Sequence, residues 1–125
     1  MTAMSLRTLV RSALASTDTV AADEERHATA AVSGCTPLVD VRHRDRVAAT
    51  GVLRSVVLHP RQEVPTVEAE LFDGSGSIDL VWMGRRQIAG IQPGRRLRVE
   101  GMVADRDGRR TMFNPRYELR ARAGE

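Results

Sequence analysis

Hydrophobic positions in the first 34 residues recur at helical spacing. Leu6, Val10 and Leu14 share one face of a helix, because residues four apart lie on the same side. A second, alanine-rich helix is expected from about Val20 to Ala31, with acidic residues in its early turns, where they suit the helix dipole. We therefore expect residues 1–34 to form a helical N-terminal arm with one narrow apolar stripe.

From Arg46 onward the pattern changes to short alternating segments separated by turn residues. The stretch 66–72 places Val67, Ala69 and Leu71 on one side and glutamates on the other, which is the two-residue period of a strand. A similar alternation follows after the hairpin signal Asp-Gly-Ser-Gly. The expected strands are 46–58, 66–72, 77–83, 95–105 and 109–113, with a brief edge pairing at 117–120.

Two further features complete the expected order. Gly51 lies inside the long first strand, where a glycine marks the bend that closing a small barrel requires. Residues 84–91 are expected to form a short helix between the third and fourth strands. This order is that of an OB fold, so we predict a mainly β protein, a five-stranded Greek-key barrel. The predicted organisation is an arm at 1–34, a connector at 35–45, the OB domain at 46–121 and a tail at 122–125.

Length and charge refine this picture. The chain has 125 residues, the size of one domain, and all 19 of its basic residues are arginine. Residues 1–45 carry 5 arginines against 6 acids, a net −1, whereas residues 46–125 carry 14 against 10, a net +4. The predicted OB domain is therefore mildly basic, which is compatible with a polyanionic partner.

The sequence gives few signals for secretion, membranes or disulfides. Cys35 is the only cysteine, so an internal disulfide is impossible. Arg7 and Arg11 interrupt the apolar runs of the N-terminal segment, and no stretch reaches the 18 apolar residues of a membrane span. We expect a cytoplasmic protein that does not enter a membrane.

Signals for catalysis are equally poor. The three histidines, His27, His43 and His59, are scattered and include no close ligand pair, so neither a metal nor another cofactor is expected. Ser75 and Ser77 have no neighbouring base that would activate them. The chain contains no lysine, which a phosphate-binding Walker motif requires. We predict that the protein is not an enzyme.

Four segments carry a family resemblance that covers about residues 44–120. They are the bent strand around Gly51, the hairpin at 71–76, the segment 93–101 (PGRRLRVEG) and the closing segment 112–118 (MFNPRYE). These residues resemble the OB domains grouped with tRNA-anticodon-binding folds, and most closely the wedge domain of RecG-type DNA helicases. The chain is also similar to short actinobacterial proteins that contain only this domain. The resemblance implies a nucleic-acid-binding domain without a motor.

OB domains usually bind ligands on the face of the second and third strands, flanked by the loops after the first and fourth strands. Arginines in these loops could contact a phosphate backbone, and an outward-facing aromatic ring could stack on a base. The candidate nucleic-acid-binding residues are Arg61, Arg106, Arg109, Arg110, Arg85, Arg86, Arg116 and Phe72.

The same face raises an alternative. Glu68, Glu70 and Asp79 should point outward and repel phosphate, unless Arg54 or Arg98 neutralises them across the strands. The candidate arginines could themselves be surface residues that pair with acids such as Asp105, Asp107 and Glu118. Trp82 alternates with apolar residues and is expected in the core, not on the binding face.

The leading hypothesis is therefore a non-catalytic module that binds single-stranded or branched DNA with low sequence specificity, with RNA left open as a ligand. The alternative is a protein–protein interaction module that uses the N-terminal helix and the acidic face of the second and third strands. In that case residues 5–31 would contact a partner or a second copy of the chain.

Overall fold

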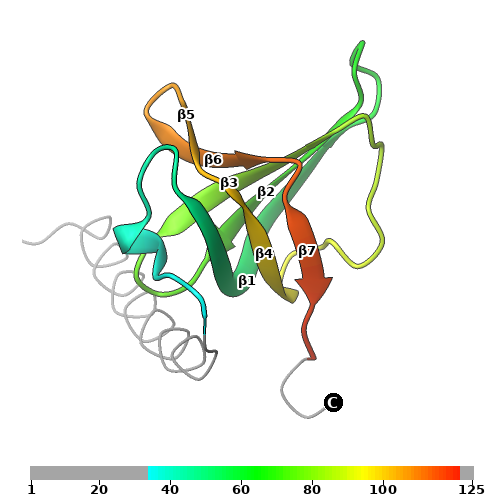
Figure 1. Ribbon diagram of the computed structural model, residues 1–125. Helices are drawn as coiled ribbons and strands as arrows, with labels where there is room; N and C mark the ends of the chain where they lie inside the picture. Colours follow the sequence, from blue (N-terminus) through cyan, green and yellow to red (C-terminus); the bar gives the residue numbers. More distant parts are fainter. Residues whose placement is uncertain (1–33, 122–125) are drawn as a thin grey trace, which may run out of the picture.

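The computed structural model describes residues 34–121, which fold into a single curled sheet (Figure 1). The prediction of a mainly β protein is confirmed. A short 3-10 helix, η1 (Leu38–Asp40), precedes the first strand. The seven strands are β1 (Arg46–His59), β2 (Thr66–Phe72), β3 (Ser77–Met83), β4 (Arg96–Met102), β5 (Ala104–Arg106), β6 (Arg109–Phe113) and β7 (Arg116–Leu119).

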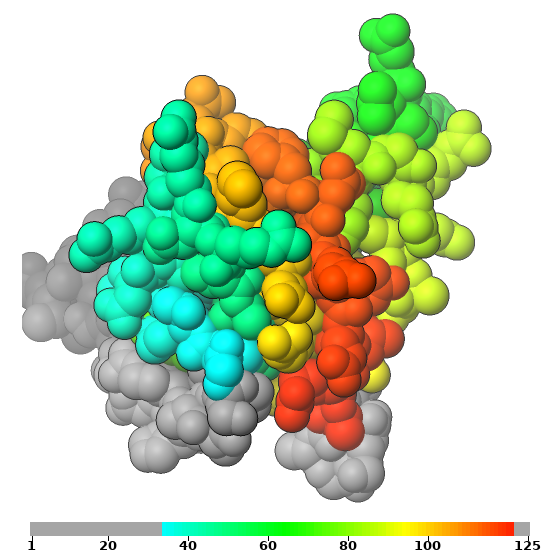
Figure 2. All heavy atoms as spheres, viewed as in Figure 1, coloured from blue at the N-terminus to red at the C-terminus, as the bar shows by residue number. Residues whose placement is uncertain are grey.

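The strands are arranged in the order β5-β6-β3-β2-β1-β4-β7. All neighbours are antiparallel except β3 and β6, which are parallel. Strand β1 is long enough to pair with β4 through its first half and with β2 through its second half. The connection between β1 and β2 projects from the body of the molecule (green in Figures 1 and 2).

Gly51 lies where β1 passes from β4 to β2, as expected for a bend. A Cβ atom at this position would lie 2.4 Å from the carbonyl oxygen of Phe72 and 2.9 Å from its carbonyl carbon. Only glycine allows two backbones to approach this closely. The sheet can therefore curl at this point, and a register shift between Leu53 and Ser55 follows directly after it.

Two sequence predictions about the elements are wrong. The sheet has seven strands, not five, and its end strands β5 and β7 do not pair with each other to close it. The expected fourth strand is interrupted at Val103, because its N–H and C=O bond to the main chain of Asp45 and Arg44 and not to a neighbouring strand. The expected short helix after β3 is also absent from residues 84–95, which form turns in which Gly84 and Gly90 adopt left-handed φ angles of 83° and 81°.

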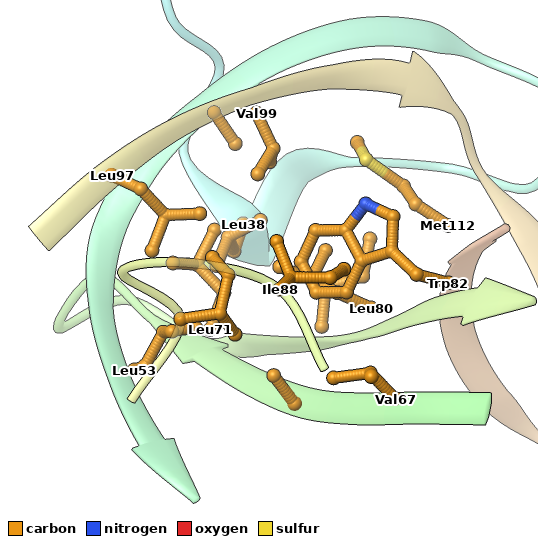
Figure 3. Close-up of a cluster of buried hydrophobic side chains, with 14 of the residues drawn as sticks. Leu38, Leu53, Val67, Leu71, Leu80, Trp82, Ile88, Leu97, Val99 and Met112 are labelled. Atoms are coloured by element: carbon orange, nitrogen blue, oxygen red, sulfur yellow. The ribbon is translucent and has the colours of Figure 1, made fainter. Parts of the chain in front are cut away.

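The core fills the inside of the curl with side chains from every long strand (Figure 3). Trp82 is 5% exposed and donates its Nε1–H to the carbonyl oxygen of Pro115 at 3.1 Å, so its predicted place in the core is confirmed. Its ring packs edge-on against Tyr117. The other labelled core residues in Figure 3 are Leu38, Leu53, Val67, Leu71, Leu80, Ile88, Leu97, Val99 and Met112.

The segment before β1 is held to the sheet by a buried carboxylate. Asp73 is 1% exposed, and its Oδ1 accepts hydrogen bonds from Ser75 and Gly76, which caps the hairpin turn. Its Oδ2 accepts a further hydrogen bond from the N–H of Leu38 at 2.8 Å, which the sequence did not indicate. Leu38 and Val41 can therefore pack into the core, 0% and 4% exposed.

The predicted helical arm, apart from Gly34, and the tail at 122–125 lie outside the described residues. Within residues 34–121, no helix is long and apolar enough to cross a membrane.

Candidate nucleic-acid interface

The outer face of β2 and β3 is where OB domains usually bind their ligands. As the alternation predicted, Glu68, Glu70 and Asp79 point away from the core, and Glu70 lies directly opposite Asp79 in the strand register. The hairpin of β5 and β6 borders this face. Its residues Arg106 and Arg109 are register partners, so their side chains extend to the same side. Together these groups line a shallow, open hollow of about 120 Å³.

Arg109 is bound to the face by a two-pronged ion pair. Its Nε lies 2.6 Å from Asp79 Oδ2, and its Nη2 lies 2.8 Å from Asp79 Oδ1. The same Nη2 lies 3.5 Å from Glu70 Oε2. The hydrogen bonds that Arg109 donates to Asp79, followed by the negative charges of Asp79 and Glu70, raise the pKa of Arg109 above its ordinary value. The guanidinium is thus fully charged and already has anionic partners.

Arg106 is engaged in the same way. Its Nη1 lies 3.0 Å from Glu68 Oε1, and its Nη2 lies 3.7 Å from Asp79 Oδ2. His59 Nε2 approaches the other oxygen of Glu68 at 3.6 Å. Each carboxylate of this face therefore contacts at least one basic side chain.

The candidate stacking residue Phe72 is also occupied. The guanidinium of Arg54 lies over its ring, with Cζ 3.8 Å from the ring centroid, and Arg54 Nη1 is 3.8 Å from Glu70 Oε1. The expected neutralisation of Glu70 by Arg54 is therefore confirmed, whereas Arg98 pairs with Glu100 at 3.6 Å. We call the set of Arg54, Glu68, Glu70, Asp79, Arg106 and Arg109 the paired face; it holds three carboxylates and three guanidinium groups.

Arg110 extends to the opposite side of the β5–β6 hairpin. Its Nη1 donates hydrogen bonds to the carbonyl oxygens of Leu38 and Val41, at 3.3 Å for Val41. This contact fixes η1 against the hairpin. The three arginines that the sequence grouped around one turn are thus divided between the paired face and η1.

The remaining candidates lie in or next to three connections at the end of the sheet where β1, β3 and β6 finish. Gly84 donates its N–H to Pro65 at 2.7 Å, which brings the β1–β2 connection beside the start of the β3–β4 connection. Asn114 bonds to Val81 and Met83, so the β6–β7 turn lies at the same end. Arg61, Arg85 and Arg86 lie in the first two of these connections, and Arg116 begins β7 directly after the third, opposite Glu100 of β4. We call these four residues the loop-end arginines.

The loop-end arginines differ from those of the paired face because their side chains are not engaged in ion pairs among the described residues. All four are exposed, and within residues 34–121 none of them forms an ion pair or a side-chain hydrogen bond. Exposed apolar side chains accompany them, with Val64, Met83 and Phe113 between 43% and 48% exposed. This end combines apolar surface with positive charge that forms no ion pair in the part of the chain that the structure describes, a combination that the sequence did not single out because its members are far apart along the chain.

No group of three or more histidine, cysteine or acidic side chains within the described part of the chain is arranged to hold a metal ion.

Neither a protein-family model nor a curated protein matches the sequence. Several solved structures match in three dimensions. RecG bound to a three-way DNA junction aligns over 72% of this chain with a TM-score of 0.56 and 21% identity. The HINb domain of p204 aligns over 68% with a TM-score of 0.55 and 11% identity, and a replication protein A heterotrimer bound to ssDNA aligns over 73% with a TM-score of 0.50 and 16% identity.

The alignments span 13% of the RecG chain, 46% of the p204 chain and 69% of the replication protein A chain. The matched parts are OB-fold domains, which in RecG is the wedge domain. The resemblance to OB domains that the sequence indicated is therefore confirmed, and the chain has an OB fold.

Proposed function

We propose that this protein is a non-catalytic nucleic-acid-binding module that contacts single-stranded or branched DNA with low sequence specificity. Its fold is similar to the wedge domain of a RecG bound to a three-way DNA junction and to a replication protein A bound to ssDNA. The observation that carries the proposal is the set of four loop-end arginines, which are exposed and form no ion pair within residues 34–121; of the four, only Arg116 lies opposite an acid, Glu100, in the strand register.

The chemistry of these residues suits a phosphate backbone. A guanidinium presents a planar set of donors that matches phosphate oxygens, and binding releases the counterions condensed on the nucleic acid. Phosphate contacts position a protein without reading bases, so low sequence specificity follows. The surrounding apolar residues Val64, Met83 and Phe113 could cover exposed base faces at a strand end or a branch point.

Fluorescence anisotropy tests the proposal. Labelled single-stranded DNA, single-stranded RNA, a duplex and a three-way junction are titrated with the full chain at several salt concentrations. We expect micromolar or tighter binding that weakens with salt; four phosphate contacts would give a log–log slope of about −3 on a single strand. Absence of binding to all four probes at low salt would overturn the proposal and favour the protein–protein interaction alternative.

A further inference from the structure

We propose that Glu68, Glu70 and Asp79 determine substrate specificity by occupying the arginines of the paired face. Their ion pairs exclude single strands from this face and leave branched DNA to the loop-end arginines. This inference rests on the proposed function and specifies the substrate class that it selects.

The first support is the geometry of Arg109. Its Nε and Nη2 are directed at the two oxygens of Asp79, 2.6 and 2.8 Å away. This fork-to-fork arrangement is the one that a guanidinium adopts with a phosphate group. The carboxylate of Asp79 thus occupies the position in which a backbone phosphate would be bound, and a strand must displace it to use Arg109.

Displacement is opposed by the unequal exposure of the two partners. The side chain of Asp79 is 13% exposed, whereas that of Arg109 is 59% exposed. The carboxylate is held between β2 and the β5–β6 hairpin, where Arg106 also contacts it at 3.7 Å. A phosphate that approaches Arg109 from solvent therefore meets Asp79 and Glu70 behind it, and their like charges repel it.

Glu70 extends the same effect to the aromatic ring. It contacts both Arg109 at 3.5 Å and Arg54 at 3.8 Å, and Arg54 covers the ring of Phe72. OB domains hold single strands by combining phosphate contacts with base stacking. On this face the phosphate-binding group, Arg109, is paired with carboxylates, and the stacking group, Phe72, is covered by Arg54. Glu70 contacts both of these arginines.

The test is the isosteric double variant E70Q/D79N, compared with D40N/D45N, which raises the net charge equally at positions away from the paired face. Each protein is titrated with a labelled oligothymidylate and with a three-way junction over a range of salt concentrations. Retention of the fold is checked by thermal unfolding and by the fluorescence of the single tryptophan, Trp82.

We expect E70Q/D79N to bind the oligothymidylate roughly tenfold more tightly than D40N/D45N, with a salt slope steeper by about 1.4, because two more phosphates are contacted. Adding R106Q and R109Q to the double variant should remove this gain. A gain no larger than that of D40N/D45N, or one that survives R106Q/R109Q, would overturn the inference.

A fallback variant and the binding of the wild type distinguish failure of the inference from failure of the proposed function. If E70Q/D79N does not fold, the single variant E68Q, at a carboxylate whose side chain is 33% exposed, should give a smaller gain by releasing Arg106, and no gain would overturn the inference. If the wild type binds the junction but E70Q/D79N gains nothing on the oligothymidylate, only the inference fails. If the wild type binds no probe while E70Q/D79N binds the oligothymidylate, the block of the paired face by its carboxylates is supported, whereas the proposed function and the assignment of branched DNA to the loop-end arginines are overturned.

Discussion

Replacing Asp73 by asparagine isolates the buried carboxylate that holds η1 to the sheet. The amide would keep one oxygen, which can still accept the hydrogen bonds from Ser75 and Gly76. Its NH₂ group would take the place of Oδ2 and face the N–H of Leu38, so that two donors would meet. Because Leu38 is 0% exposed, water cannot replace the lost acceptor without opening the segment.

The magnitude follows from these contacts. A hydrogen bond to a charged group contributes about 1.5–3 kcal/mol, and an unsatisfied buried donor costs about 1–3 kcal/mol. Since these terms overlap, we expect D73N to lower the free energy of unfolding by about 2–3 kcal/mol. For a domain of this size that lowers Tm by roughly 10–20 °C.

The matched control is D105N, which also changes an aspartate that caps a turn but at an exposed position. Asp105 Oδ1 accepts one hydrogen bond, from Gly108 at 2.8 Å, and the amide oxygen of asparagine can accept the same bond. We expect a loss within about 0.5 kcal/mol, as for surface substitutions in general. Both variants are measured by urea unfolding followed through Trp82. If D73N were no less stable than D105N, Asp73 would not be the group that fixes η1.

Two further changes test the fold and the division of the arginines. Gly51→Ala should lower the free energy of unfolding by at least about 3 kcal/mol, because the new Cβ would lie 2.4 Å from a backbone oxygen. Gly101→Ala, whose Cβ would have its nearest neighbours at 3.6 Å, should lower it by less than about 1 kcal/mol in the same urea experiment. Equal losses would contradict the close approach at the bend. Arg110→Met removes the hydrogen bonds to Leu38 and Val41 and should cost about 1–2 kcal/mol in urea. The same variant should change junction affinity less than about threefold in anisotropy, since Arg110 lies outside the loop-end set, and a tenfold loss would return Arg110 to the binding site.

The sequence predicted the strands that depend on local signals. Residues 66–72 and 77–83 alternate between apolar and polar over most of their length and flank a hairpin turn signal, so β2 and β3 were predicted with their observed bounds. The break at Val103 was missed because it depends on hydrogen bonds to residues 44 and 45, far away in the sequence. The absence of a helix after β3 was missed because left-handed glycines allow turns that propensity alone does not exclude.

The sequence predicted which residues lie at the site but not which of them contact one another. Alternation correctly placed Glu68, Glu70 and Asp79 on the outer face, and proximity along the chain grouped Arg109 with Arg110. The two arginines extend to opposite sides of β6 because strand neighbours alternate. The acceptor that each guanidinium meets, a carboxylate for Arg109 and main-chain carbonyl oxygens for Arg110, depends on how the hairpin curls over the sheet. That curl is set by tertiary packing, which a single sequence does not reveal.

The most direct test of the central claim compares two triple variants of equal charge on the three-way junction. R61Q/R85Q/R86Q removes three loop-end arginines, whereas R42Q/R44Q/R46Q removes three exposed arginines that precede or begin β1. We expect the first variant to lose at least tenfold in affinity and to show a salt slope shallower by about 2–3, because up to three phosphate contacts are lost. The second variant should lose only what its lower net charge causes. Equal losses in the two variants would show that net charge alone drives binding and would contradict the assignment of the loop-end arginines.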